Sequence, residues 1–258
     1  MVPGSQHARS TGPALIRSLA RLTDPGGSAS RPAFAERLSQ WLRWTDAVSL
    51  SAALNVSPAA PSGRTDPSGG VGAAEREFAR ARGMLAKAIV EDELFAPDAP
   101  GPGPSAASPG AGAPAEFAPY RLRYHARQQA MEAGIATLRE NVRTTLAAAS
   151  PAMARLAALD AVMEQALFPH ERSLLSTVPA LLQGRFEALR GAGPSAGVGA
   201  TGREEARPEG AGRGKTDGWL DVFCKDMQGV LLAELELRLQ PVEALLAALR
   251  TSPTRLHG

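Results

Sequence analysis

Residues 120–146 read YRLRYHARQQAMEAGIATLRENVRTTL, and this stretch decides the fold. Apolar side chains recur in it every three or four residues, which places them on one face of an α-helix. The residues that form this face are Tyr124, Gln128, Met131, Ile135, Leu138, Val142 and Leu146. Because the spacing is kept along the whole stretch, it predicts an amphipathic helix much longer than the helices of a compact globin-like fold.

Two further segments, 151–190 and 217–250, continue the same spacing. Ser150 followed by Pro151 is typical of a helix start, since serine caps the first turn and proline needs no amide partner there. We expect the buried face of the first segment to comprise Leu156, Leu159, Met163, Leu167, Leu174, Val178, Leu181 and Leu189.

Three prolines interrupt these segments, and proline inside a helix removes an amide donor and clashes with the preceding turn. We expect kinks near Pro169 and Pro241 and a break over 176–179. A new helix can start after that break with Pro179 in its first turn. The segment 151–190 is therefore predicted to form two helices.

The N-terminal third also has helical spacing. We expect helices over 12–23, over 30–55 with Ser30 as the N-terminal cap, and over 73–95. The stretch 34–54 is apolar on more than one face, so we expect it to lie inside an N-terminal helical cluster rather than on its surface.

Glycine and proline mark the boundaries between these helices. They are concentrated in three segments: 55–72, 97–116 and 191–216. Such segments have too few large apolar side chains to offset the entropy of ordering them. We predict that they are disordered Gly/Pro/Ala-rich linkers and that residues 1–11 are a disordered tail. The remaining chain divides into N-terminal helical segments, 12–96, and a long-helix bundle, 117–250.

Residues that favour β-sheets are scarce, and aromatic residues make up only 5% of the chain. The predicted fold class is all-α: an elongated antiparallel bundle with coiled-coil-like long helices. Segment 117–146 has an excess of arginine and segment 217–250 has an excess of acidic residues. We expect this charge difference to place these two helices side by side, although each surface ion pair contributes little.

The 258-residue chain has one cysteine and four histidines. A single cysteine excludes an intramolecular disulfide and a cysteine-based zinc site, and Cys224 is expected to be a small buried hydrophobe. Glycine-rich strings within 191–216 match nucleotide-binding and nucleophile-elbow motifs but lack the strand that those motifs require. The acidic run 91–93 stands at a helix end and indicates fraying. We therefore expect no metal, no cofactor and no enzymatic activity.

No apolar run is long enough for a membrane span or a signal peptide. The prediction is a bacterial cytoplasmic protein without a transmembrane segment. The net charge of +2 is close to balance, so we expect no nucleic-acid binding.

The most suggestive local stretch surrounds Asp46, which is the only charged residue between Arg43 and Arg64 and lies close to Trp41 and Trp44. A half-buried carboxylate needs hydrogen-bond donors, either from neighbouring helices of the same chain or from a partner. The first interpretation makes Asp46 a structural tie, and the second makes it a binding residue. We take four residues as candidate interaction residues: Trp41, Trp44, Asp46 and Trp219.

Three strings together carry a resemblance: QWLRWTDAVSLSAALN (40–55), PAMARLAALDAVMEQAL (151–167) and WLDVFCKDMQGVLLAELELRLQPVEALL (219–246). They resemble an uncharacterised bacterial family of all-helical proteins of about this length. The resemblance implies no known activity and no assigned catalytic residue. Genes of this kind neighbour genes for a proton-channel-like membrane protein and a peptidoglycan-binding protein, which implies an envelope-associated assembly.

The favoured function is therefore a non-enzymatic helical scaffold or accessory protein that packs against other proteins, with self-association as a further option. The alternative is a protein that binds nucleic acid or another anionic surface through the arginine-rich helix 121–143. Its candidate residues are Arg121, Arg123, Arg127, Arg139 and Arg143.

Overall fold

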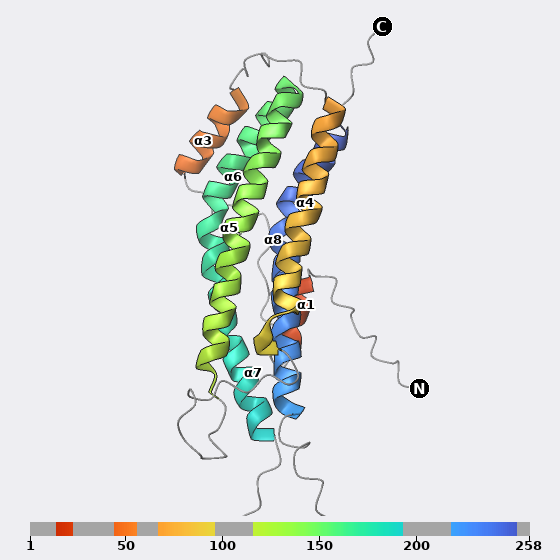
Figure 1. Cartoon of the computed structure of the whole chain (residues 1–258). Coiled ribbons are helices and arrows are strands. Elements are labelled where there is room, and N and C mark those ends of the chain that lie inside the picture. The colour runs from red at the N-terminus through yellow and green to blue at the C-terminus, as the bar shows by residue number, and fades with distance from the viewer. Residues whose placement is uncertain (1–13, 23–43, 56–66, 96–115, 193–217, 252–258) are drawn as a thin grey trace, which may run out of the picture.

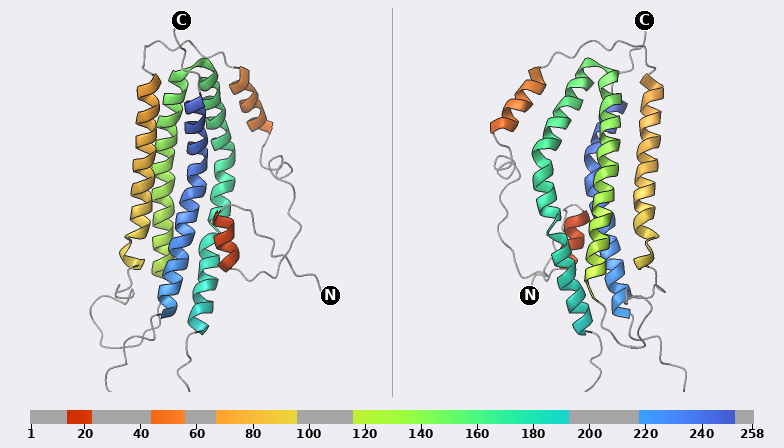
Figure 2. Two further views of the ribbon diagram at one scale, coloured as in Figure 1. Left: turned by 90° about the vertical axis from the view of Figure 1, so that its right-hand side faces the viewer. Right: turned by 60° about the vertical axis from the view of Figure 1, so that its left-hand side comes forward.

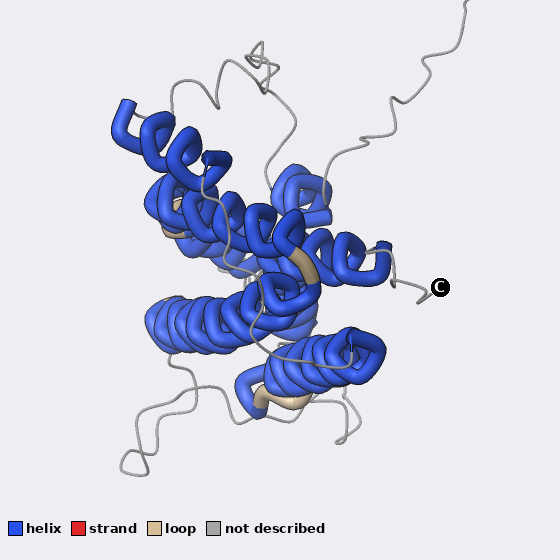
Figure 3. The backbone as a smooth tube through the Cα atoms, turned by 90° about the horizontal axis from the view of Figure 1, so that it is seen from above, coloured by secondary structure: helices blue, strands red, loops and turns tan. Residues whose placement is uncertain are grey.

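The computed structural model describes residues 14–22, 44–55, 67–95, 116–192 and 218–251 (Figure 1). Regular structure in these ranges is helical throughout and includes no strand, as the view along the bundle also shows (Figure 3). The elements are α1 (Ala14–Leu22), α3 (Trp44–Asn55), α4 (Pro67–Val90), the 3-10 turn η1 (Glu93–Phe95), α5 (Ala118–Ala149), α6 (Pro151–Leu175), α7 (Val178–Ala192) and α8 (Gly218–Thr251). The predicted all-α, elongated bundle is confirmed.

Long helices that follow one another in sequence run in opposite directions, whereas α5 and α8 run parallel (Figure 1). α5 packs against α4, α6 and α8, and α4 packs against both α5 and α8. The predicted apolar face of α5 is buried along its whole length, from Tyr124 to Leu146. The matching face of α8 contributes the largest share of the core, including Phe223, Met227 and Leu231. These two helices therefore form the centre of the bundle.

The start of α6 follows the predicted capping pattern. The backbone N–H of Met153 donates to Ser150 Oγ at 3.2 Å, and Pro151 occupies the first turn. α6 continues through Pro169 and α8 continues through Pro241. The predicted break is present, because α6 ends at Leu175 and α7 begins at Val178.

On both sides of the break the buried side chains differ from the expected ones. Leu174, expected in the core, is 55% exposed, and Leu175 is buried instead. After the turn, Leu182 is fully buried while Leu181 is only half-buried. The turn between α6 and α7 resets the rotational phase of the helix, so an unbroken period misplaces Leu181 by one position. Leu174 precedes this turn, and its misplacement lies within the last turn of α6.

The N-terminal helices do not form a cluster of their own, which corrects the expectation for 34–54. α1 packs on α8 and α7, α3 packs on α6, and α4 packs on α5 and α8 (Figure 2). Leu15, Ala74 and Ile89 share one core with the C-terminal helices. α3 lies on the outside of the bundle, with Val48 52% exposed and Leu54 58% exposed. Residues 23–43, including Trp41, lie outside the described residues.

α4 begins at Pro67, inside the predicted linker 55–72. A Cβ atom at Gly70 would lie 3.4 Å from Thr145 Cγ2, so glycine here allows a close approach of α4 to α5. Val71 also packs against the core, and this packing outweighs the poor helix propensity of the glycines. The rest of the predicted linkers and the tail 1–11 fall outside the described residues, apart from Asn55, Glu116, Gly191 and Ala192.

Candidate functional site

A buried carboxylate lies at the centre of the bundle. Glu234 on α8 is fully buried and accepts a hydrogen bond from the Tyr124 hydroxyl at 2.6 Å. The Gln128 amide nitrogen donates to both carboxylate oxygens at 3.1 and 3.2 Å and to the Leu175 carbonyl at 3.3 Å. Arg238 Nε, one turn along α8, donates to the same carboxylate at 2.9 Å. Every oxygen of this charge is therefore paired, as burial requires.

Gln128 also explains how the break between α6 and α7 is tolerated. Its amide reaches the carbonyl of Leu175, the last residue of α6, where the helix no longer supplies an amide partner. Burial raises the pKa of Tyr124 well above its ordinary value, and the negative charge of Glu234 adds to the shift. The hydroxyl thus stays protonated and donates.

Glu171 on α6 stands at the edge of this cluster. Its carboxylate lies 3.3 Å from Arg238 Nη1. Burial raises the pKa of Glu171; the charges of Arg238 and Arg139 only partly oppose that shift, and nearby Glu234 and Glu132 add to it. Glu171 is accordingly a carboxylate whose ionised form is disfavoured by the fold.

A second polar cluster joins α5 to α6. Arg139 binds Asp160 through two hydrogen bonds of 2.8 and 2.6 Å, and Arg143 Nε donates to Asp160 at 2.7 Å. Arg143 also pairs with Glu164 and with Glu140. Burial alone would raise the pKa of Asp160, but the hydrogen bonds and charges of the two arginines together lower it.

This second cluster corrects the charge argument made from the sequence. α5 does lie beside α8, as expected. However, the ion pairs found for the arginines of α5 reach α6 and the end of α4, along with Glu140 of α5 itself, and none within the described residues reaches α8. The α5–α8 contact is apolar apart from the buried Glu234 cluster.

Asp92 was expected to mark a fraying helix end, and the structure shows otherwise. It is buried and pairs with Arg127 Nη2 at 2.6 Å and with Arg123 Nε at 3.6 Å. It also accepts the backbone N–H of Leu94 at 3.1 Å and so caps η1. Gln228 donates to the carbonyls of Ile89 and Val90, which completes the polar pairing at the end of α4.

Trp219 belongs to an aromatic group at one end of the bundle. Its ring centroid lies 5.2 Å from that of Phe186 in an edge-on arrangement, and Phe186 in turn lies 5.0 Å from Phe223. Tyr120 packs against both phenylalanines. Cys224 is buried beside this group, and burial raises its pKa to about 11. The prediction that Cys224 is buried is confirmed.

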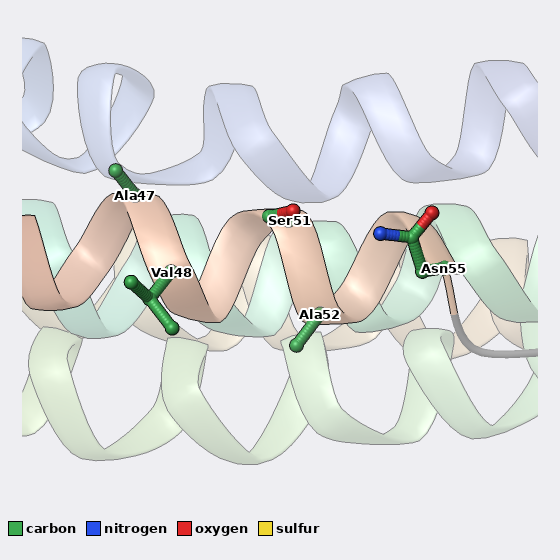
Figure 4. A pocket seen from close by; sticks show the side chains of 5 residues that line it. All are labelled: Ala47, Val48, Ser51, Ala52 and Asn55. Carbon is green, nitrogen blue, oxygen red and sulfur yellow. The ribbon is translucent and has the colours of Figure 1, made fainter.

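Asp46 lies half-buried in the first turn of α3, where a negative charge is favoured by the helix dipole. Trp44 is the first residue of α3. A hollow on the outer side of α3 is lined by Ala47, Val48, Ser51, Ala52 and Asn55 (Figure 4). All five residues are exposed and none carries a charge. The structure thus keeps Asp46 near an apolar surface but places Trp219 with the aromatic group at the other end of the bundle.

The arginines of the alternative function are largely engaged within the protein. Arg127, Arg139 and Arg143 each pair with at least one carboxylate and are no more than half-exposed. Arg123 faces Asp92, and Arg121 is exposed. A phosphate-binding stripe needs several cations that face solvent together, and this helix offers fewer than the sequence suggested.

Within the described residues, no three His, Cys, Asp or Glu side chains are placed to hold a metal ion. No helix among them is both long and apolar enough to cross a membrane.

Sequence reasoning missed Glu234 and Asp92. Glu234 carried a signal, because it lies three and four residues from the core positions Leu231 and Val230 and four before Arg238. Asp92 carried none, since its partners come from another helix.

Residues 1–251 match the model of a family described as "Protein of unknown function (DUF3348)". No curated protein and no solved structure matches the chain. Since that family model spans nearly the whole sequence, the chain belongs to the DUF3348 family.

Proposed function

We propose that the protein is a non-enzymatic helical scaffold or accessory protein that acts by binding other proteins. The observation that carries this proposal is the outer side of α3. Val48 and Leu54 are both more than half exposed there, next to the uncharged hollow of Figure 4. Large apolar side chains that stay exposed beside an uncharged hollow indicate a surface for a partner.

The polar clusters support the same proposal. Asp92, Glu234 and Asp160 are each held by side chains of other helices, and these contacts fix the register of the bundle. Because these carboxylates are bound within the fold, we assign them a structural role and no part in a reaction. We further propose that the protein works on the cytoplasmic side of an envelope-associated assembly, as the family resemblance implies.

A pull-down with matched variants tests the proposal. The full chain carrying Val48→Asp and Leu54→Asp should lose partners that the unaltered chain captures from cells. Met84→Asp is the control, because Met84 is equally exposed but lies on α4. Identical capture by all three proteins would contradict a partner surface on α3, as would equal loss in the Met84→Asp control.

A further inference from the structure

Arg238 of α8 binds two carboxylates that belong to different helices. Its Nε and Nη2 atoms each lie 2.9 Å from Glu234 Oε1, and its Nη1 atom lies 3.3 Å from Glu171 Oε1 on α6. The two carboxylates differ in exposure, because Glu234 is fully buried whereas the side chain of Glu171 is 41% exposed. One guanidinium thus joins an inner carboxylate, closed off from water, to an outer one that water reaches.

This cluster has more negative than positive charge when all its groups are ionised. Arg238 offsets only one of the two carboxylates that it binds. The nearby groups of α5 do not restore the balance, since Arg139 is already paired with carboxylates of α6 and Glu132 adds a further negative charge. Burial raises the pKa of Glu171, and Glu234 and Glu132 raise it further. Glu171 is therefore the group of the cluster that both meets solvent and favours a proton.

The cluster is also joined to the turn between α6 and α7. Glu171 lies one helical turn before Leu175, which is the last residue of α6. The Gln128 amide nitrogen donates both to the Leu175 carbonyl at 3.3 Å and to Glu234 at 3.1 Å. The next two residues, Ser176 and Thr177, are exposed, and their hydroxyls donate only to carbonyls of α6. An outward shift of Glu171 therefore draws Leu175 away from Gln128.

We propose that Glu171 is a proton-controlled latch for the end of α6. With the proton bound, the neutral carboxyl group stays beside Arg238 and adds no surplus charge, so the last turn of α6 remains against α5 and α8. When the proton leaves to solvent, the carboxylate is better hydrated outside the cluster, and the last turn of α6 opens with residues 176–177. The bond between Tyr124 and Glu234 does not involve α6 and stays closed.

The latch makes one end of α6 responsive to pH, with opening as the pH rises. This role is separate from partner binding at α3 and does not depend on it. Glu171→Gln keeps the shape of the protonated side chain but has no proton to lose, so it should hold the latch closed at every pH. His170 is the neighbouring residue on α6 and also titrates near neutral pH, so His170→Gln is the matched control.

Hydrogen exchange of the full chain tests the latch. Rates for residues 172–182 are divided by those of an unfolded peptide at the same pH, which removes the chemical effect of pH on exchange. We expect the protection of this segment to fall roughly threefold or more from about pH 5 to about pH 8 in the unaltered chain and in His170→Gln. It should stay constant in Glu171→Gln. The core segment 230–239 of α8 should change less than residues 172–182.

Two results of this experiment would overturn the latch. One is a fall in protection that persists in Glu171→Gln or disappears in His170→Gln. The other is an equal fall in residues 172–182 and 230–239, which would indicate opening of the whole bundle.

Carboxyl-carbon nuclear magnetic resonance tests the proton itself. The Glu171 signal is the one missing from Glu171→Gln, and we expect its titration midpoint to lie above the ordinary value for glutamate. A midpoint at or below the ordinary value would contradict the proposal. Loss of helical circular dichroism in Glu171→Gln would also contradict it, because the neutral side chain should favour the closed fold.

Discussion

α5 contacts α8 along one side and α6 along another, and the two contacts are built from different chemistry. The α8 contact is lined by large buried side chains such as Met131, Leu138 and Phe223, with the buried ion pair of Glu234 and Arg238 at its centre. The α6 contact is held by Arg139 and Arg143 against Asp160 and Glu164, which remain partly exposed.

This difference shows two ways of holding one helix in register. In the dry contact every donor around Glu234 must be matched, because water cannot replace a lost partner. In the ion-paired contact water and salt compete with each pair, so the contact is strong only as a network. The two contacts of α5 are therefore expected to respond differently to salt and to the loss of one partner.

The largest expected effect is loss of the buried charge. Glu234→Ala leaves Tyr124, Gln128 and Arg238 without their common acceptor, and breaking a buried pair in this way costs about 3–5 kcal/mol. Urea denaturation measures the free energy of unfolding. Glu236→Ala is the control, since Glu236 pairs with Arg82 at the surface and should cost about 0–1 kcal/mol. Equal losses in the free energy of unfolding for Glu234→Ala and Glu236→Ala would contradict the special cost of removing the buried charge.

A smaller loss is expected on the other side of α5. Arg143→Ala removes charge-assisted hydrogen bonds to Asp160 and Glu164, and we expect a loss of about 1–3 kcal/mol. Part of this loss should disappear in 1 M salt, because partly exposed pairs are screened. Glu234→Ala should show little salt dependence. A salt response of the same size in both variants would contradict the distinction between a dry contact and an ionic one.

The two contacts should also differ in their dependence on pH. The pKa of Asp160 is lowered, so its contribution is present above its unfolded pKa and is lost as the pH falls through its folded pKa. The pKa of Glu171 is raised, so ionisation opposes folding and stability increases as the pH falls through that raised pKa. Glu171→Gln should therefore raise the melting temperature at pH 7, by an amount that vanishes in acid. Asp160→Asn should lower it at pH 7. A fall for Glu171→Gln at pH 7 would refute this assignment.

The smallest effect is expected at the periphery. Val48→Ser changes an exposed side chain of α3, so the free energy of unfolding should change by no more than about 0.5 kcal/mol. Leu138→Ala, in the core of α5, should lose about 2–5 kcal/mol under the same conditions. If Val48→Ser cost more than about 1 kcal/mol, the outer side of α3 would be covered in solution.

Much of the fold could be predicted from spacing alone. The buried face of α5, the cap at Ser150 and the break before Pro179 all depend on nearest neighbours along one helix, and each is confirmed. Leu181 was misplaced because the turn after Leu175 shifts the phase of everything beyond it. The helical start at Pro67 was missed because contact with Thr145, far along the chain, overrides local propensity.

Fewer of the candidate site residues could be predicted from helical spacing. Asp46 lies half-buried on α3 and Trp44 is the first residue of that helix, but Trp219 packs into the aromatic group. Asp92 and Glu234 escaped notice because a charge is read as exposed until its partners are known. Their partners Arg127 and Tyr124 are on α5, and only the packing of α5 against its neighbours brings them together.

The sequence by itself determined that this protein is a set of long amphipathic helices, because helical period is a property of residues three and four positions apart. It also determined where α6 ends, because proline acts on its own turn. Only the tertiary structure decided which helices meet, which charges are buried and which apolar side chains stay uncovered. Those outcomes depend on distances between residues far apart in the chain, and the charge balance of whole segments is too weak a force to specify them.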